Sequence, residues 1–234
     1  MLWVFLSRLY PDFVPSPSAT IAFLVSEGVG KLLYNTVLTL SRSMAGFLLG
    51  LAGAVGLGYL YTLHPLLREA VKALNVVLQS ISVLIWIIVF LMLFGIYSPL
   101  PPILVSTAVS LPIMLSSIVA GLESSTRRLI ELAAVLGAPR WRVYPDFLLP
   151  SLVPSLAGAA RAALGAALRI SVVAEAMGAS GGIGYMIENY YSLAEPVGVF
   201  AWGLLLVALM VTLDQLVLAR LEGWAKSWAT LPQR

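Results

Sequence analysis

Apolar stretches long enough to cross a membrane recur along the whole chain. A helix needs about 20 predominantly apolar residues to span the hydrocarbon core of a bilayer. The chain is 60% hydrophobic and only 11% charged, whereas soluble domains are about 25% charged. No soluble core could bury so much apolar surface. The sequence therefore predicts an all-α polytopic membrane protein of about five transmembrane helices, built as a single domain over residues 1–234.

The expected spans are separated by polar segments, and an interfacial or amphipathic segment precedes them. Residues 1–34 form that N-terminal segment, with Ser16 or Ser18 as a helix cap and an amphipathic surface helix over 21–33. One stripe of small residues in the first span, with a period of four, favours close helix packing. The expected spans are 35–61, 73–94, 103–122, 148–177 and 197–218.

The charges of the loops predict the orientation in the membrane. Segments 62–72 and 123–146 and the C-terminal tail are basic, 95–102 is uncharged, and 178–196 is acidic without Lys or Arg. Because basic loops stay in the cytoplasm, we expect the N-terminus outside and the C-terminus inside, in the plasma or inner membrane. The net charge of +3 is explained by this loop pattern, so the bilayer, and no nucleic acid, is the expected partner.

The stretch 131–150 is the most polar of the chain, and residues 123–146 are expected to be a structured cytoplasmic loop. A short helix fits 127–136, and Gly137 is suited to end it. The Ala138-Pro139 pair then turns the chain, and Pro139 suits the first turn of a second short helix.

A residue pattern over 131–150 resembles the cytoplasmic signature loop of ABC importer permeases. Its matching positions are Glu131, Ala133, Gly137, Phe147, Leu149 and Pro150, and Leu132 departs from the usual Ala. The resemblance implies the type I ABC importer permease fold, in which a coupling helix within the loop 123–146 docks on a separate ATPase subunit. The implied ATPase-coupling residues are Arg127, Arg128, Glu131, Ala133, Ala134, Gly137, Ala138, Pro139 and Pro150.

A second stretch, residues 172–187, resembles the nitrate/sulfonate/taurine class of these permeases, and Arg42, Pro154 and Arg161 match it too. The prolines that the class carries before Trp86 are absent here, in a region that lines the path in relatives. The segment 14–19 resembles an element that follows the first span in one subfamily, so the chain is expected to begin inside that span.

The resemblance also implies partners. These are a second permease copy, giving a homodimer, two ABC ATPase subunits and an extracytoplasmic solute-binding protein. ATP and Mg would be bound by the ATPase, so this chain is expected to be a non-catalytic transport subunit without a cofactor of its own.

Polar side chains at membrane depth are the candidates for lining a translocation path. They are Gln79, Ser82, Arg169 and Glu175. In a water-filled path Arg169 would favour an anionic solute; alternatively it pairs with Glu175 or reaches outward. Glu175 could gate the path, contact a docking protein or pair with a neighbour. Arg161 and Arg42 are expected to be structural, paired or reaching the interface.

Two other functional classes are compatible with a chain of this composition. An ATP-independent secondary transporter or channel would show an inverted repeat or broken-helix pairs in both halves, and no clear repeat is visible. An intramembrane protease is suggested only by the GxSG string at residues 178–181. The single histidine, His64, precedes that serine and lies in a loop, so no base would activate it.

Overall fold

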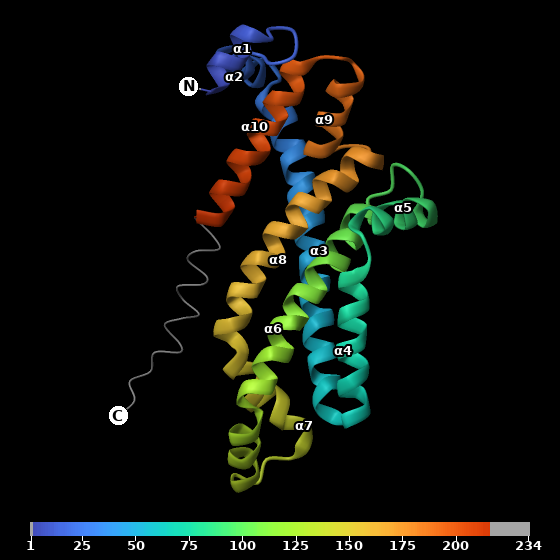
Figure 1. The fold of residues 1–234 in the computed structure, drawn as a ribbon, viewed down its shortest axis with the longest axis vertical. Helices are drawn as coiled ribbons and strands as arrows, with labels where there is room; N and C mark the ends of the chain where they lie inside the picture. The colour runs from blue at the N-terminus through green and yellow to red at the C-terminus, as the bar shows by residue number, and fades with distance from the viewer. Residues whose placement is uncertain (1, 216–234) are drawn as a thin grey trace, which may run out of the picture.

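The structure, a computed structural model, describes residues 2–215 of the 234. All of the regular secondary structure in that range is helical. The described chain is an elongated bundle, with the long helices running along one axis (Figure 1). Three short helices lie at one end of it: α1 (Leu2–Leu9), α2 (Pro17–Ser26) and α9 (Ile183–Ser192). The end of α6 (Leu100–Val135) and α7 (Arg140–Arg142) lie at the other.

Four of the described helical segments are long and apolar enough to cross a membrane, and the number is five if one bent pair of helices is counted as a single span. This confirms the prediction of about five spans. The four segments are Val29–Leu63, Leu100–Ser124, Val143–Gly178 and Pro196–Leu213. The helices that contain them are α3 (Val29–Leu63), α6, α8 (Leu149–Gly178) and α10 (Pro196–Leu213).

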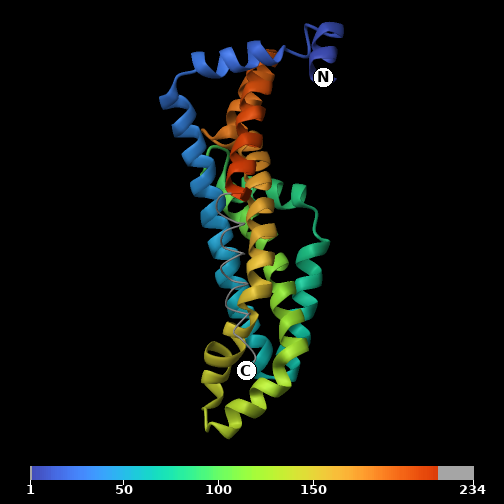
Figure 2. The same cartoon turned by 90° about the vertical axis from the view of Figure 1, so that its left-hand side faces the viewer.

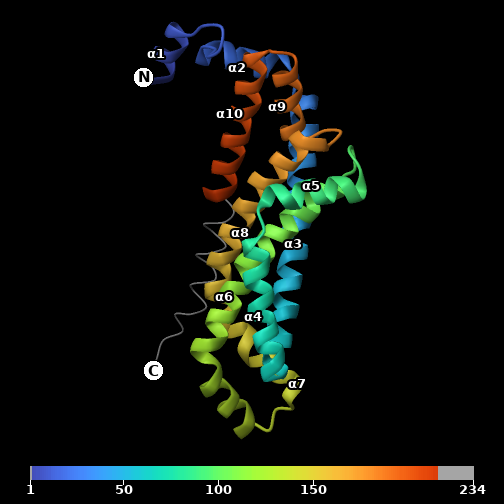
Figure 3. The same ribbon diagram turned by 45° about the vertical axis from the view of Figure 1, so that its right-hand side comes forward.

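The second span is not the straight helix expected over 73–94. Helix α4 (Pro65–Ser80) begins earlier and breaks at residues 81–82, and α5 (Val83–Phe94) continues at 90° to it. Figure 3 shows α5 lying across the direction of α4. The basic segment 62–72 is largely helical and not the expected loop, because Pro65 starts a helix there and His64 Nδ1 accepts a hydrogen bond from the Leu66 amide at 3.2 Å.

The N-terminal segment is helical but divided differently from the prediction. Ser16 is the cap of α2, and its hydroxyl accepts from the Ala19 amide at 3.2 Å, as expected. The predicted amphipathic helix over 21–33 is wrong. The chain breaks at Gly28, whose φ of 82° cannot occur inside a right-handed helix, and α3 begins after it. Figure 2 shows α2 running crosswise above α3.

Helix α6 runs unbroken from the membrane span into the polar segment. The separate short helix predicted over 127–136 is therefore wrong. Residues 123–126 contain neither Gly nor Pro, so nothing there ends the helix. After α7 comes a short π-helix, η1 (Val143–Leu148), which leads into α8. A further helix, α9, lies within the segment 178–196, which was expected to be a loop.

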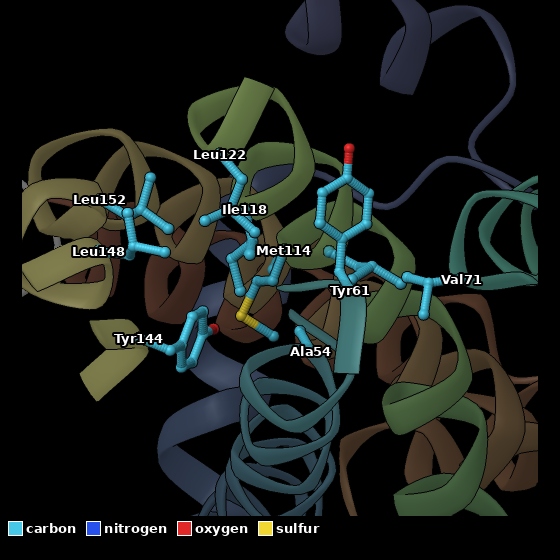
Figure 4. Close-up of a cluster of buried hydrophobic side chains, with 11 residues drawn as sticks. Ala54, Tyr61, Val71, Met114, Ile118, Leu122, Tyr144, Leu148 and Leu152 are labelled. Atoms are coloured by element: carbon cyan, nitrogen blue, oxygen red, sulfur yellow. The ribbon is translucent and has the colours of Figure 1, made fainter. Parts of the chain in front are cut away.

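The core lies where α3, α6 and α8 pack together. The buried side chains there include Met114, Ile118 and Leu122 of α6, with Tyr144 and Leu148 of η1 (Figure 4). The predicted small stripe on α3 is buried: Gly46, Gly50, Ala54 and Gly58. A Cβ added at Gly46 would lie 2.5 Å from the Ile103 carbonyl oxygen, so the stripe sets how closely α3 and α6 approach.

Candidate coupling segment and translocation path

The C-terminal end of α6 is closed by a Schellman motif. Gly137 has a φ of +69°. Its amide donates to the Ala134 carbonyl at 3.1 Å, and the Ala138 amide donates to the Ala133 carbonyl at 2.9 Å. These two bonds satisfy carbonyls that the helix end would otherwise leave unpaired. The prediction that Gly137 ends this helix is confirmed.

The residues around that motif expose several apolar side chains. Val135 is 84% exposed and Trp141 60% exposed, and Leu132 and Leu136 are exposed as well. We call the exposed side chains of residues 131–141 the coupling surface. Contiguous exposed apolar side chains of this kind are typical of a protein-binding site.

The predicted coupling residues are not all on that surface. The exposed ones are Glu131, Ala134, Gly137, Pro139 and, at the start of α8, Pro150. Ala138 is half-buried. Ala133 is fully buried, so its small side chain faces the fold instead. The side chains of Arg127, Arg128 and Arg140 lie outside the described residues.

The segment after the coupling surface is anchored to the core by Tyr144. Its ring is buried, and its hydroxyl donates to the Val55 carbonyl of α3 at 3.0 Å. The same hydroxyl lies where a Cβ at Gly58 would be, 2.6 Å away. The glycine therefore leaves room for the tyrosine, and sequence reasoning missed this contact because 86 positions separate the two residues.

The predicted path residues Gln79 and Ser82 lie on either side of the bend between α4 and α5. Gln79 is exposed, and its Nε2 donates to the Ser116 hydroxyl of α6 at 3.3 Å. Ser82 is exposed and precedes the first residue of α5, without a side-chain capping bond. The bend thus presents two exposed polar side chains next to α5, whose twelve residues are all apolar.

Arg169 is exposed in the middle of α8. Its Nε donates to the Gly165 carbonyl one turn earlier, at 3.1 Å, and no carboxylate among the described residues pairs with it. The predicted alternative, a pair with Glu175, is wrong. Nine residues separate Arg169 from Gly178, which is about 14 Å of helix. The guanidinium therefore lies well inside the span, on the outside of this single chain.

Glu175 is fully buried and paired with Arg42 of α3. Arg42 Nη1 lies 3.0 Å from Glu175 Oε1 and donates to the Gly181 carbonyl at 2.6 Å. Glu175 Oε2 accepts from the Thr39 hydroxyl at 2.8 Å and from the Gly184 amide at 3.2 Å. The expectation that Arg42 pairs is confirmed. Both oxygens of Glu175 are occupied within the chain.

Two further α3 side chains, missed from the sequence, complete this network. Asn35 Oδ1 accepts from the Gly182 amide at 2.8 Å, and Thr39 Oγ1 accepts from the Ile183 amide at 2.8 Å. With the Gly184 amide on Glu175, these bonds satisfy free amides at the start of α9. The spacing of Asn35, Thr39 and Arg42 places them on one helix face, a signal that was available. The glycine-rich loop is therefore fixed to α3.

Arg161 pairs with Asp214, just beyond α10. Its Nε and Nη2 donate to the two carboxylate oxygens at 2.8 and 2.6 Å. This two-bond geometry ties α8 to the end of α10. The predicted structural role of Arg161, through a neighbouring carboxylate, is confirmed.

Comparison with known proteins agrees with this arrangement. Residues 46–224 match the family model described as "Binding-protein-dependent transport system inner membrane component". The chain is 32% identical to the riboflavin transport system permease protein RibX of Chloroflexus aurantiacus, over 91% of this chain and 79% of that protein. It is 24% identical to the taurine transport system permease protein TauC of Escherichia coli, over 95% and 82% respectively.

The fold is also found among solved structures. An inward-facing structure of the MetNI methionine ABC transporter contains a chain that superposes with a TM-score of 0.67 at 24% identity. The superposition covers 87% of this chain and 96% of that one. The family model matches most of the sequence, and the fold superposes over most of the structure. The first match assigns the chain to a family of permeases, and the second supports the same fold. The chain belongs to the binding-protein-dependent transport system inner membrane component family, as an ABC importer permease of the class that includes the taurine permease.

Proposed function

We propose that this permease imports a small anionic solute, driven by two separate ATPase subunits that dock on the coupling surface. The observation that carries the proposal is the exposed apolar side chains at the end of α6, with Val135 and Trp141 most exposed. Exposed apolar surface at a water-facing end calls for a protein partner. ATP and Mg would be bound by that partner, and this chain would bind neither.

The anionic character of the solute is supported by Arg169. A guanidinium inside a membrane span is costly to expose to lipid, so it faces protein or water. Since no carboxylate among the described residues pairs with it, a water-filled path beside a second copy of the chain suits it best. TauC is named for taurine, whose sulfonate would suit such a cation; RibX is named for riboflavin.

The other expected partners are a second copy of the chain and a solute-binding protein. A second copy, giving a homodimer, would enclose the path between the exposed faces of α8 and the α4–α5 bend. A solute-binding protein would deliver the solute at the end that carries α9. The loop charges support an N-terminus outside and a C-terminus in the cytoplasm. The coupling surface would then face the ATPases.

An ATP-independent transporter gains no support from the helices. Such proteins use broken helices in corresponding positions of two repeats. Among the described residues one bent pair is found, α4 with α5. A single bend fits a gate at one side of the path better than a site formed by two repeats.

The test is purification of the chain from its native membrane in mild detergent, with identification of the proteins that accompany it. We expect an ABC ATPase to co-purify, and to be lost when Val135 is replaced by Asp or Gly137 by Ala. Gly28→Ala is the matched control, because Gly28 also has a positive φ and an open environment but lies next to α2, which is at the opposite end of the bundle. A chain that purifies alone and moves solute without ATP would overturn the proposal.

A further inference from the structure

Helix α4 is held to the rest of the fold mainly by polar contacts. Only Val71 of its 16 residues is buried. At the middle of the helix, Lys72 Nζ lies 2.7 Å from Glu123 Oε1 of α6. Further along, Asn75 Nδ2 donates to the Ser116 hydroxyl of α6 at 2.9 Å. Because little apolar surface fixes α4 in place, these polar contacts determine whether it moves together with α6.

Glu123 is also contacted from α3. The hydroxyl of the buried Tyr61 donates to the same Oε1 at 3.2 Å. The Arg68 guanidinium lies 5.2 Å, and the Lys72 ammonium 6.0 Å, from the centre of the Tyr61 ring, so two cations of α4 rest on that ring. Glu123 is therefore the point at which three helices meet.

The space around this meeting point extends to the coupling surface. A cavity of about 600 Å³ is lined by Tyr61, Lys72 and Glu123 and also by Glu131. Glu131 follows Glu123 by eight residues of one unbroken helix, which is about 12 Å. A displacement of the coupling surface would thus reach Glu123 through a rigid element, with room beside it for the side chains to move.

From Glu123 the connection continues to the bend. Lys72 belongs to α4, and α4 ends where the chain turns through 90° into α5. Beyond the bend, Ile87 of α5 packs with Val105 of α6 and Ala174 of α8. Movement of α4 therefore changes the angle at a bend that carries the predicted path residues Gln79 and Ser82.

We propose that Lys72, Glu123 and Tyr61 form a joint that passes displacement of the coupling surface to α4 and to the α4–α5 bend. These are positioning residues, and none contacts the solute. The inference rests on the proposed function. The side chains of Lys72 and Glu123 are 39% and 52% exposed, and exposed ion pairs contribute little to folding. Loss of the pair should therefore impair coupling and leave the fold intact.

Because the sequence contains no cysteine, a single introduced cysteine can report movement of α4 by its rate of chemical labelling. Ser80, the exposed last residue of α4, is replaced by Cys, which costs only a hydroxyl bond to the Val76 carbonyl of the same helix. The complex is purified with its ATPase, and the rate of labelling by a fluorescent maleimide is measured on the band of this chain. The rates with and without ATP plus vanadate are compared.

We expect ATP to change the labelling rate in the Ser80→Cys parent. The change should be lost in Lys72→Met and in Glu123→Gln while ATP hydrolysis continues, and restored when Lys72→Glu is combined with Glu123→Lys. Glu69→Gln is the control and should keep the change, because Glu69 is 3.9 Å from Lys72 on the same helix and does not reach α6.

Two results would overturn the joint. One is an ATP-dependent change that survives in both single variants. The other is a parent that hydrolyses ATP with no change in labelling, since α4 would then not move. A complex that contains no ATPase would count against the proposed function instead, so the two failures are distinguishable.

Discussion

Arg42 of α3 and Glu175 of α8 form a buried ion pair, with 3.0 Å between Nη1 and Oε1. The side chain of Glu175 is fully buried and that of Arg42 is 6% exposed. The pair holds together two spans and, through the Gly181 carbonyl and the Gly184 amide, the loop that leads into α9. This buried carboxylate therefore stabilises the fold at the end of the bundle that carries α9.

Removing one partner of this pair should destabilise the protein strongly. Arg42→Met leaves the Glu175 carboxylate buried without its cation, a change that costs about 3–5 kcal/mol in comparable sites. The double variant Arg42→Met/Glu175→Met should lose less than the single variant. Thermal unfolding midpoints in detergent measure both. Arg161→Met is the comparison, because its pair with Asp214 is about half exposed and should contribute much less to the free energy of unfolding than the buried pair. Equal losses in Arg42→Met and Arg161→Met would contradict the prediction.

Close packing of α3 against α6 should make Gly46 intolerant of a side chain. Gly46→Ala would place a Cβ 2.5 Å from the Ile103 carbonyl oxygen and forces the helices apart, at a cost of about 1–3 kcal/mol. Gly56→Ala is the matched control on the same helix, since nothing lies within 4 Å of its Cβ position. That change should stabilise by up to about 1 kcal/mol through helix propensity. The two unfolding midpoints should therefore shift in opposite directions.

The end of the bundle that carries α9 should become less stable in acid. Tyr190 donates to Glu27 Oε1 at 2.6 Å, and Lys31 Nζ lies 2.7 Å from Oε2. Partial burial raises the pKa of Glu27, but the hydrogen bonds from Lys31 and Tyr190 outweigh it and hold that pKa below its ordinary value. Because the folded pKa is depressed, this stability is present above the ordinary pKa of a glutamate and is lost as the pH falls through the folded pKa.

The readout is the difference in unfolding midpoint between the natural chain and Glu27→Gln, followed from neutral pH into acid. We expect a difference that is constant near neutrality and shrinks below the ordinary glutamate pKa. A difference that stays the same over the whole range would show that the charge of Glu27 contributes nothing to the contact between α9 and the start of α3.

Arg169 should control the affinity for an anionic solute. Charge-assisted hydrogen bonds contribute about 1.5–3 kcal/mol, so Arg169→Gln should raise the KM for uptake about 10- to 100-fold, and Arg169→Lys less. The measurement is ATP-dependent uptake into vesicles against solute concentration. Val173→Thr, one turn away and also exposed, should leave KM near its natural value. An unchanged KM in Arg169→Gln would remove the argument for an anion.

The sequence by itself determined the features that depend on neighbouring residues. The spans followed from local hydropathy, Ser16 from its capping pattern, and Gly137 from its need for a positive φ at a helix end. The family followed from residues within 131–150 and 172–187. Each of these signals lies within one or two helical turns, or within one short motif, so no knowledge of packing was needed.

Only the tertiary structure decided which distant residues meet and where helices bend. The partner of Glu175 lies 133 positions away, on another span. Hydropathy treats residues 73–94 as one apolar run and carries no information about a 90° turn within it. Helix α6 continues to the coupling surface because no Gly or Pro ends it after the span, and no residue pattern in the sequence marks this continuation. Ion pairs and bends follow from packing between helices, which local sequence does not encode.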